Sequence, residues 1–218
     1  MNEILDRAII LATQPYRDHD WIIRWLTESN GRIDTLARHA RSPGSPFHGR
    51  IGLYNECRIQ VTRRRSSGLF VLRECELLNH PDYLGASILR LSAMASASAM
   101  VERLTEMETP LGDIYISLKK LLAALAGSDA PGIEGHYTIF EVELLAECGA
   151  LPGHLPDLLA QRTGAPTHPS PAHDFAIRMK KFGEACLDRQ HITLPDVRSR
   201  FFDRLTSQLN PHKYGGNK

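Results

Sequence analysis

Arginines are the residues with the clearest chemical potential in the first 80 positions of this 218-residue chain. Arg63, Arg64 and Arg65 are consecutive and stand beside a glycine-containing turn. Long cationic side chains spaced along a groove bind phosphate groups, with an affinity that is independent of base sequence and weakens steeply with salt. We predict a phosphate-backbone site from these three residues and from Arg32, Arg38, Arg41 and Arg50. The competing interpretation is a run of solvated surface arginines.

Two tryptophans offer a second kind of contact. Aromatic side chains can stack with bases where a protein holds a single strand. Trp21 and Trp25 alternate with Ile23 on one predicted strand. A tryptophan stripe on one face of a strand usually packs inside a barrel, so we expect both side chains in the core.

A second cationic group lies near the C-terminus, where Phe201, Phe202 and Leu205 stand among basic residues. Exposed cations beside apolar surface complement a peptide that combines acids with a hydrophobic end. The predicted partner-binding residues are Arg178, Lys180, Lys181, Arg198, Arg200 and Arg204. The alternative is an ordinary amphipathic helix, and for Phe201 and Phe202 individually we prefer a place in the core.

Recognisable catalytic motifs are missing. The sequence has no phosphate-binding glycine-lysine loop, no H-E-x-x-H pair and no G-x-S-x-G elbow. Its four cysteines, Cys57, Cys75, Cys148 and Cys186, lack the close C-x-x-C spacing of a zinc or redox site. We expect reduced, buried thiols in a cytosolic protein. We predict no enzymatic activity, no metal and no cofactor.

The net charge of +1 conceals an uneven distribution. Residues 1–80 contain 12 arginines, no lysine and 9 acids, a net +3. Residues 81–170 are −6 and residues 171–218 are +4. Basic ends favour an anionic partner, but +3 over 80 residues is modest for a dedicated nucleic-acid-binding domain. No stretch has the length and apolarity of a membrane span, and the first residues do not resemble a secretory signal.

Residues 7–79 have the pattern of short strands separated by turn residues. Asn30-Gly31 between two β-like runs is a strong hairpin signal, and Ser66-Ser67-Gly68 predicts another. A hairpin centred there places Cys57 close to Cys75 across the ladder. The predicted strands cover 7–13, 21–27, 32–40, 53–65 and 69–78, with a loop at 42–46. Five short strands favour an OB barrel, although an SH3-like barrel fits the pattern almost as well.

After residue 81 the apolar period changes from two to 3.6 residues, which predicts helices. They are expected at 86–107, 113–126, 137–148, 172–187 and 195–209. Gly127 and Gly149 suit left-handed caps at two of these helix ends. Five prolines between 151 and 171 predict a loop with at most a short helix at 155–162. We therefore predict an α+β chain, with an OB-fold domain at 1–80 and a helical domain at 81–218.

Several segments, in the right order, resemble a known family. They are 8–11 (A-I-I-L), 16–20 (Y-R-D-H-D), 26–32 (L-T-E-S-N-G-R), 37–41 (A-R-H-A-R), 140–145 (F-E-V-E-L-L) and 198–202 (R-S-R-F-F). The set resembles the bacterial RecO family and spans most of the chain. In that family a basic loop usually follows the fourth segment, whereas residues 42–46 here read S-P-G-S-P. Some members bind zinc through four cysteines after the fifth segment, but residues 151–171 contain none, so metal binding is not carried over.

The resemblance implies a cytoplasmic, nucleoid-associated recombination mediator of DNA repair that performs no covalent chemistry. Such a protein binds single- and double-stranded DNA and promotes strand annealing. It loads RecA together with RecR and single-strand-binding protein, whose acidic C-terminal tail ends in phenylalanine. Two alternatives stay open: a protein-interaction adaptor whose OB-fold has weak or lost DNA binding, and a small-molecule enzyme with a pocket in the helical part.

Overall fold

The computed structural model describes residues 3–63, 68–150 and 196–209. The chain forms two compact units. The barrel unit contains residues 1–81 and 105–116, and the helical unit contains residues 82–104 and 117–218. The predicted loop at 151–171 and the predicted helices at 155–162 and 172–187 lie outside the described residues.

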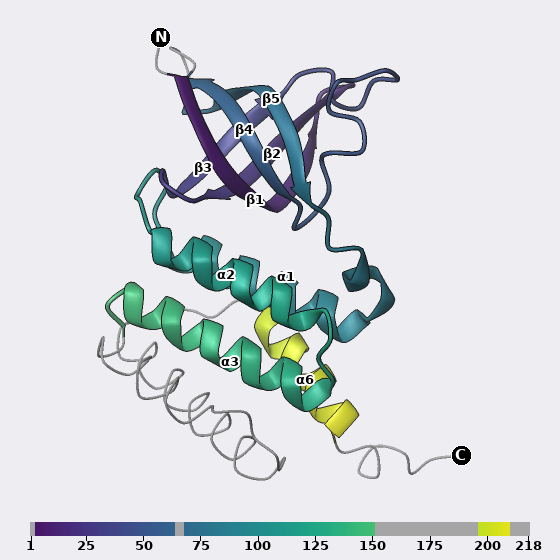
Figure 1. Cartoon of the computed structure of the whole chain (residues 1–218), viewed down its shortest axis with the longest axis vertical. Helices are drawn as coiled ribbons and strands as arrows, with labels where there is room; N and C mark the ends of the chain where they lie inside the picture. The colour runs from purple at the N-terminus through teal and green to yellow at the C-terminus, as the bar shows by residue number, and fades with distance from the viewer. Residues whose placement is uncertain (1–2, 64–67, 151–195, 210–218) are drawn as a thin grey trace. The chain divides into compact units, whose positions relative to one another are not determined.

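Five strands close into a barrel (Figure 1). They are β1 (Glu3–Tyr16), β2 (Asp20–Thr27), β3 (Arg32–Ala37), β4 (Glu56–Arg63) and β5 (Phe70–Asn79). The strands neighbour one another in the order β1-β2-β3-β5-β4, and β4 pairs with β1 to close the ring. Only the pair β3–β5 is parallel among these five pairings. This connectivity is that of an OB-fold, so the predicted architecture is confirmed.

Period-two alternation along β2 fills the barrel interior. Ile23 and Trp25 are fully buried, and the half-buried Trp21 packs against the same core. The indole Nε1 of Trp25 donates a hydrogen bond to Oγ1 of Thr35 in β3, at 2.8 Å. The prediction that both tryptophans belong to the core is confirmed.

The two buried cysteines of the barrel lie near each other, as predicted. In the β4–β5 ladder Cys57 is opposite Leu77 and Cys75 is opposite Ile59, so the cysteines are diagonal neighbours. Both thiols are reduced. Their mutual hydrogen bond and their burial raise the pKa of Cys57.

The Asn30-Gly31 hairpin is also confirmed. Gly31 has φ +67°, and the Thr27 N–H donates to its carbonyl oxygen at 2.9 Å. A Cβ atom at Gly31 would lie 1.9 Å from the carbonyl oxygen of Thr109. The segment after the first long helix therefore returns to the barrel and approaches this turn more closely than any side chain would permit.

The helical unit contains the 3₁₀ turn η1 (Asp82–Ala86) and the helices α1 (Ile88–Leu104), α3 (Ala130–Glu147) and α6 (Asp196–Leu209). It also contains most of α2 (Gly112–Leu125), whose first turn belongs to the barrel unit. Helix α1 packs against both α3 and α6 (Figure 1). α3 begins seven residues earlier than predicted because Asp129 caps it: its Oδ1 accepts the Gly132 N–H at 3.0 Å, and Pro131 lies in the first turn.

One of the two predicted glycine caps is correct. Gly149 follows α3 with φ +72°, in the left-handed region. The prediction for Gly127 is wrong, because this residue does not adopt a positive φ. Helix α2 ends earlier, with the Ala126 N–H bonded to the Ala123 carbonyl, and the Ser128 hydroxyl donates to the Ala124 carbonyl at 2.7 Å. These bonds satisfy the last carbonyls without a left-handed residue.

Candidate nucleic-acid interface

The β1–β2 turn and the segment that follows β3 are held side by side. The Arg41 N–H donates to the His19 carbonyl oxygen at 2.9 Å. The His39 N–H donates to Oδ1 of Asp20 at 2.8 Å. These two bonds bring arginines from two separate segments of the chain to the same end of the barrel.

Exposed guanidinium groups at this end lie over aromatic rings. Cζ of Arg41 is 5.5 Å from the ring centroid of Trp21, and Cζ of Arg17 is 5.3 Å from that of Tyr16. Arg38 is exposed and directly precedes His39, whose backbone is bonded to Asp20. A cation stacked on a ring keeps its N–H edges free to bind an acceptor. We call Tyr16, Arg17, Trp21, Arg38 and Arg41 the turn cluster.

The positive charge of the turn cluster is only partly offset. Asp18 and Asp20 lie in the same turn. Within residues 3–63, 68–150 and 196–209, however, no carboxylate forms an ion pair with Arg17, Arg38 or Arg41. Their N–H groups therefore face solvent and can donate hydrogen bonds to phosphate oxygens.

Arginines on the outer faces of the strands differ in this respect. Arg24 pairs with Asp34 across β2 and β3, at 4.0 Å. Arg58 pairs with Glu76 across β4 and β5. Each guanidinium thus has an anionic neighbour within the barrel itself.

Arg50 lies at the end of the loop after β3 and contacts β5. Its Nη1 donates to the Cys75 carbonyl oxygen at 2.9 Å. Arg50 and Arg73 line a hollow of about 190 Å³ together with Glu74 and Glu76. Both signs of charge line this hollow, so it is less suited to a polyanion than the turn cluster.

Arg32 and Arg63 both contact the segment that precedes α2. Nε of Arg32 donates to Oγ1 of Thr105 at 2.7 Å, and its Nη2 donates to the Thr105 carbonyl oxygen. The guanidinium of Arg63 makes a two-point contact with the carboxylate of Glu108, which raises the pKa of Arg63. Its Cζ also lies 4.6 Å from the ring centroid of Phe70.

The structure therefore separates the arginines that the sequence grouped together. Arg38 and Arg41 belong to the turn cluster, whereas the other three described ones contact protein groups. Arg64 and Arg65 lie outside the described residues. The DNA-binding role of the set stays a prediction.

Comparison with known proteins shows which proteins the chain is similar to. Residues 1–81 match the family model "Recombination protein O N terminal". These residues, which include all five strands of the barrel, are therefore similar to the N-terminal part of RecO proteins. The chain is 28% identical over 149 residues to a DNA repair protein RecO of Rhodopirellula baltica, covering 68% of the chain and 53% of that relative. It is also 26% identical over 150 residues to RecO of Lawsonia intracellularis, covering 69% of the chain and 60% of the relative.

The similarity extends beyond the barrel but not over whole relatives. A third relative, RecO of Pelotomaculum thermopropionicum, is 26% identical over 144 residues, which are 66% of the chain and 56% of that protein. The chain spans between half and three fifths of the length of these relatives. The resemblance predicted from the sequence is confirmed.

Sequence reasoning missed two residues of the turn cluster, Tyr16 and Arg17. Both were part of a polar turn with no chemical role assigned to it. Their significance depends on the neighbouring segment at Arg38 and Arg41, which is separated from them by two strands. The predicted Asn30-Gly31 hairpin already pairs β2 with β3. The missing signal was the contact of Arg41 and His39 with the β1–β2 turn, which forms only in the tertiary structure.

The predicted partner-binding arginines of helix α6 also differ in exposure. Arg198 is 2% exposed, and its guanidinium makes a two-point ion pair with Glu141 of α3. It is therefore unavailable to a peptide on the surface, unlike the exposed Arg200. Arg204 is exposed as well, and its Nη1 donates to Oγ of Ser92. Arg178, Lys180 and Lys181 lie outside the described residues.

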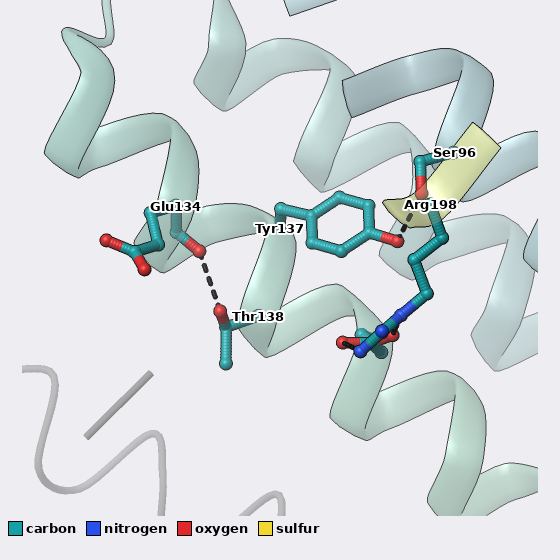
Figure 2. A network of polar contacts seen from close by, with 6 residues as sticks. Ser96, Glu134, Tyr137, Thr138 and Arg198 are labelled. Atoms are coloured by element: carbon teal, nitrogen blue, oxygen red, sulfur yellow. Dashed lines mark hydrogen bonds and ion pairs between the residues drawn. The ribbon is translucent and has the colours of Figure 1, made fainter. Parts of the chain in front are cut away.

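Aromatic packing explains the inward position of Arg198. Phe201 and Phe202 are buried, which confirms the preference for core packing. The centroid of the Tyr137 ring is 4.6 Å from that of Phe201 and 5.6 Å from that of Phe202. The Tyr137 hydroxyl is 2.6 Å from Oγ of Ser96 and lies near Arg198 (Figure 2). Burial raises the pKa of Tyr137, so its hydroxyl stays protonated.

Two other kinds of site are absent from residues 3–63, 68–150 and 196–209. No group of three His, Cys, Asp or Glu side chains there could hold a metal ion. None of the helices described is both long and apolar enough to cross a membrane.

Proposed function

We propose that this chain is a RecO-family recombination mediator in DNA repair, whose barrel binds the sugar–phosphate backbone through the turn cluster. The observation that carries the proposal is the gathering of Arg17, Arg38 and Arg41 beside Tyr16 and Trp21, with no described carboxylate pairing with the arginines. Stacked arginines supply phosphate contacts, and the exposed Tyr16 ring can add a base contact. Neither kind of contact reads base sequence.

Binding of this kind supports strand annealing without covalent chemistry. Two complementary strands repel each other through their phosphates, and a cationic surface that holds both lowers this repulsion. Single- and double-stranded DNA are therefore both proposed ligands. The proposed partners that act with the chain are RecR and single-strand-binding protein, and the proposed outcome is loading of RecA.

The C-terminal tail of single-strand-binding protein is the proposed partner of α6. Arg200 and Arg204 are exposed on this helix and can contact an acidic peptide. Arg198 contributes indirectly, since its ion pair with Glu141 fixes α6 against α3. Of the predicted partner-binding residues, Arg200 and Arg204 are therefore the ones to test first.

A second candidate function is a protein-interaction adaptor whose OB-fold binds DNA weakly or not at all. One observation favours it: two of the predicted DNA-binding arginines, Arg32 and Arg63, are bonded to the chain's own segment before α2. The loop at 42–46 adds no basic residue to replace them. The two candidates differ in whether the barrel binds an oligonucleotide at low salt.

Fluorescence anisotropy with a labelled oligothymidylate, measured over a range of salt concentrations, tests the proposal. The informative variant is Arg38→Ala/Arg41→Ala, and the charge-matched control is Arg24→Ala/Arg58→Ala, which removes two arginines that have ion-pair partners. Each lost single-strand phosphate contact reduces the slope of log affinity against log salt by about 0.7, so the first variant should lose about 1.4 and the control little. Equal losses in both variants would overturn the assignment, and no binding by the wild-type protein would favour the adaptor.

A further inference from the structure

We propose that Glu108 is an internal competitor for DNA: its carboxylate occupies a phosphate-binding position formed by Arg63 and Phe70. The inference rests on the proposed function and extends it. Nucleic acid reaches Arg63 only after Glu108 leaves, so this contact lowers the affinity of the barrel and limits binding to strands that displace it.

The geometry at Arg63 is that of an occupied oxyanion site. Both terminal nitrogens of Arg63 donate to the two carboxylate oxygens of Glu108, with Nη1 to Oε1 at 3.2 Å. Arginine binds phosphate through the same two-point arrangement. The guanidinium is stacked on Phe70, its cross-strand partner, which fixes its plane. Replacing a carboxylate by a phosphodiester changes neither the charge nor the donor geometry that is needed.

Strand β3 connects this position with the turn cluster. Phe70 pairs with Thr35 in the parallel β3–β5 ladder. Thr35 stands three positions before Arg38, a distance of about 10 Å along an extended chain. A DNA strand that binds at Arg38 and continues along β3 toward Arg32 therefore approaches the Arg63–Glu108 pair.

The backbone holds Glu108 in place against its own conformational preference. Glu108 has φ +57°, a region that residues other than glycine rarely adopt. Its N–H donates to the Arg32 carbonyl oxygen at 2.8 Å, and Met107 forms a bridge with Arg32. Thr109 is fixed next to Gly31. The surrounding contacts thus impose an unfavourable conformation at the residue whose side chain reaches Arg63, as is common at functional positions.

The pair is accessible and exchangeable. The side chains of Arg63 and Glu108 are 44% and 36% exposed. Exposed ion pairs contribute little to stability and are screened by salt. A polyanion can therefore replace the carboxylate without unfolding the segment. Glu106, in the same segment, is exposed and makes no described ion pair, so it provides an internal control.

Anisotropy with the labelled oligothymidylate tests the inference in a double-mutant cycle. The proteins are wild type, Glu108→Gln, Arg63→Gln, the double variant and the control Glu106→Gln. We expect Glu108→Gln to bind about threefold or more tightly at low salt, with the log–log salt slope steeper by about 0.7, the value of one further single-strand phosphate contact. The gain should vanish in the Arg63→Gln background and should be absent in Glu106→Gln.

A second variant tests whether the change in affinity comes from an effect on folding. Glu108→Gly removes the carboxylate and accepts the positive φ without strain, so it should bind as tightly as Glu108→Gln and melt no lower than wild type. Equal affinities for Glu108→Gln and Glu106→Gln, or a gain that persists without Arg63, would overturn the inference while leaving the proposed function intact. If neither the wild type nor any variant binds the oligonucleotide, both proposals fall.

Discussion

The guanidinium of Arg198 and the carboxylate of Glu141 form a two-point ion pair inside the helical unit, where their side chains are only 3% and 5% exposed. The pair joins α6 to α3, and the Arg198 guanidinium also lies 4.8 Å from the ring centroid of Phe202. Removing one member leaves the other charge buried without its partner. The cost of such a change is much larger than the net contribution of the pair itself.

Arg198→Met is therefore expected to lower the free energy of unfolding by about 3–5 kcal/mol. The double variant Arg198→Met/Glu141→Leu replaces both charges by apolar groups of similar size and should unfold close to wild type. Urea denaturation followed by circular dichroism measures both. A double variant no more stable than the single one would show that the burial of charge is not the cause.

The barrel core contains a comparable polar contact between Trp25 and Thr35. Thr35→Val keeps the shape of the side chain but leaves the buried indole N–H without an acceptor, at a cost of about 1–3 kcal/mol. Thr35→Ser retains the hydroxyl and is expected to lose less. The free energies of unfolding of the two variants, from tryptophan fluorescence in urea, give the comparison. Equal losses would assign the effect to packing.

Gly31 is expected to be the glycine least tolerant of substitution in the barrel unit. Gly31→Ala meets both the left-handed backbone, which costs about 1–2 kcal/mol, and the clash with Thr109, which adds about 1–3 kcal/mol. Gly44 has φ +78° and open space around it, so Gly44→Ala isolates the backbone effect. Thermal melts of both variants should rank Gly31→Ala as clearly less stable. An equal effect would mean that the segment at Thr109 moves away at little cost.

The raised pKa of the Cys148 thiol leads us to predict that the stability of the protein depends on pH. Burial, with a smaller contribution from the charge of Glu147, raises its pKa from 9.0 to about 11. A raised pKa means that the folded protein favours the protonated thiol, so this contribution is complete below about pH 9 and is lost as the pH rises toward 11. The difference in free energy of unfolding between wild type and Cys148→Ala should therefore be constant up to about pH 9. Above that pH, wild type should lose stability relative to the variant. A difference that stays constant to pH 11 would contradict it.

Much of the fold follows from residues close together in sequence. Alternation along 21–25 places Trp25 in the core, and the Asn30-Gly31 turn joins β2 to β3 as expected. The start of α3 could not be predicted from apolar periodicity, so the helix was placed seven residues too late. The helix begins with a cap at Asp129 and a proline in its first turn instead of a row of large apolar residues. The predicted cap at Gly127 is wrong because the hydroxyl of the neighbouring Ser128 bonds to a carbonyl at the end of α2 instead.

The sequence alone determined that this chain contains a small five-stranded barrel followed by helices, and that its first 80 residues are rich in arginine without a catalytic motif. Strand periodicity, turn residues and helix faces are encoded over a few positions, so they can be read locally. Only the tertiary structure decided which arginines face solvent: Arg38 and Arg41 join Arg17, Arg63 meets Glu108, and Arg198 enters the core. A guanidinium on a long side chain takes its electrostatic state from whatever distant segment folding places beside it, and strand closure and helix packing fix that neighbour.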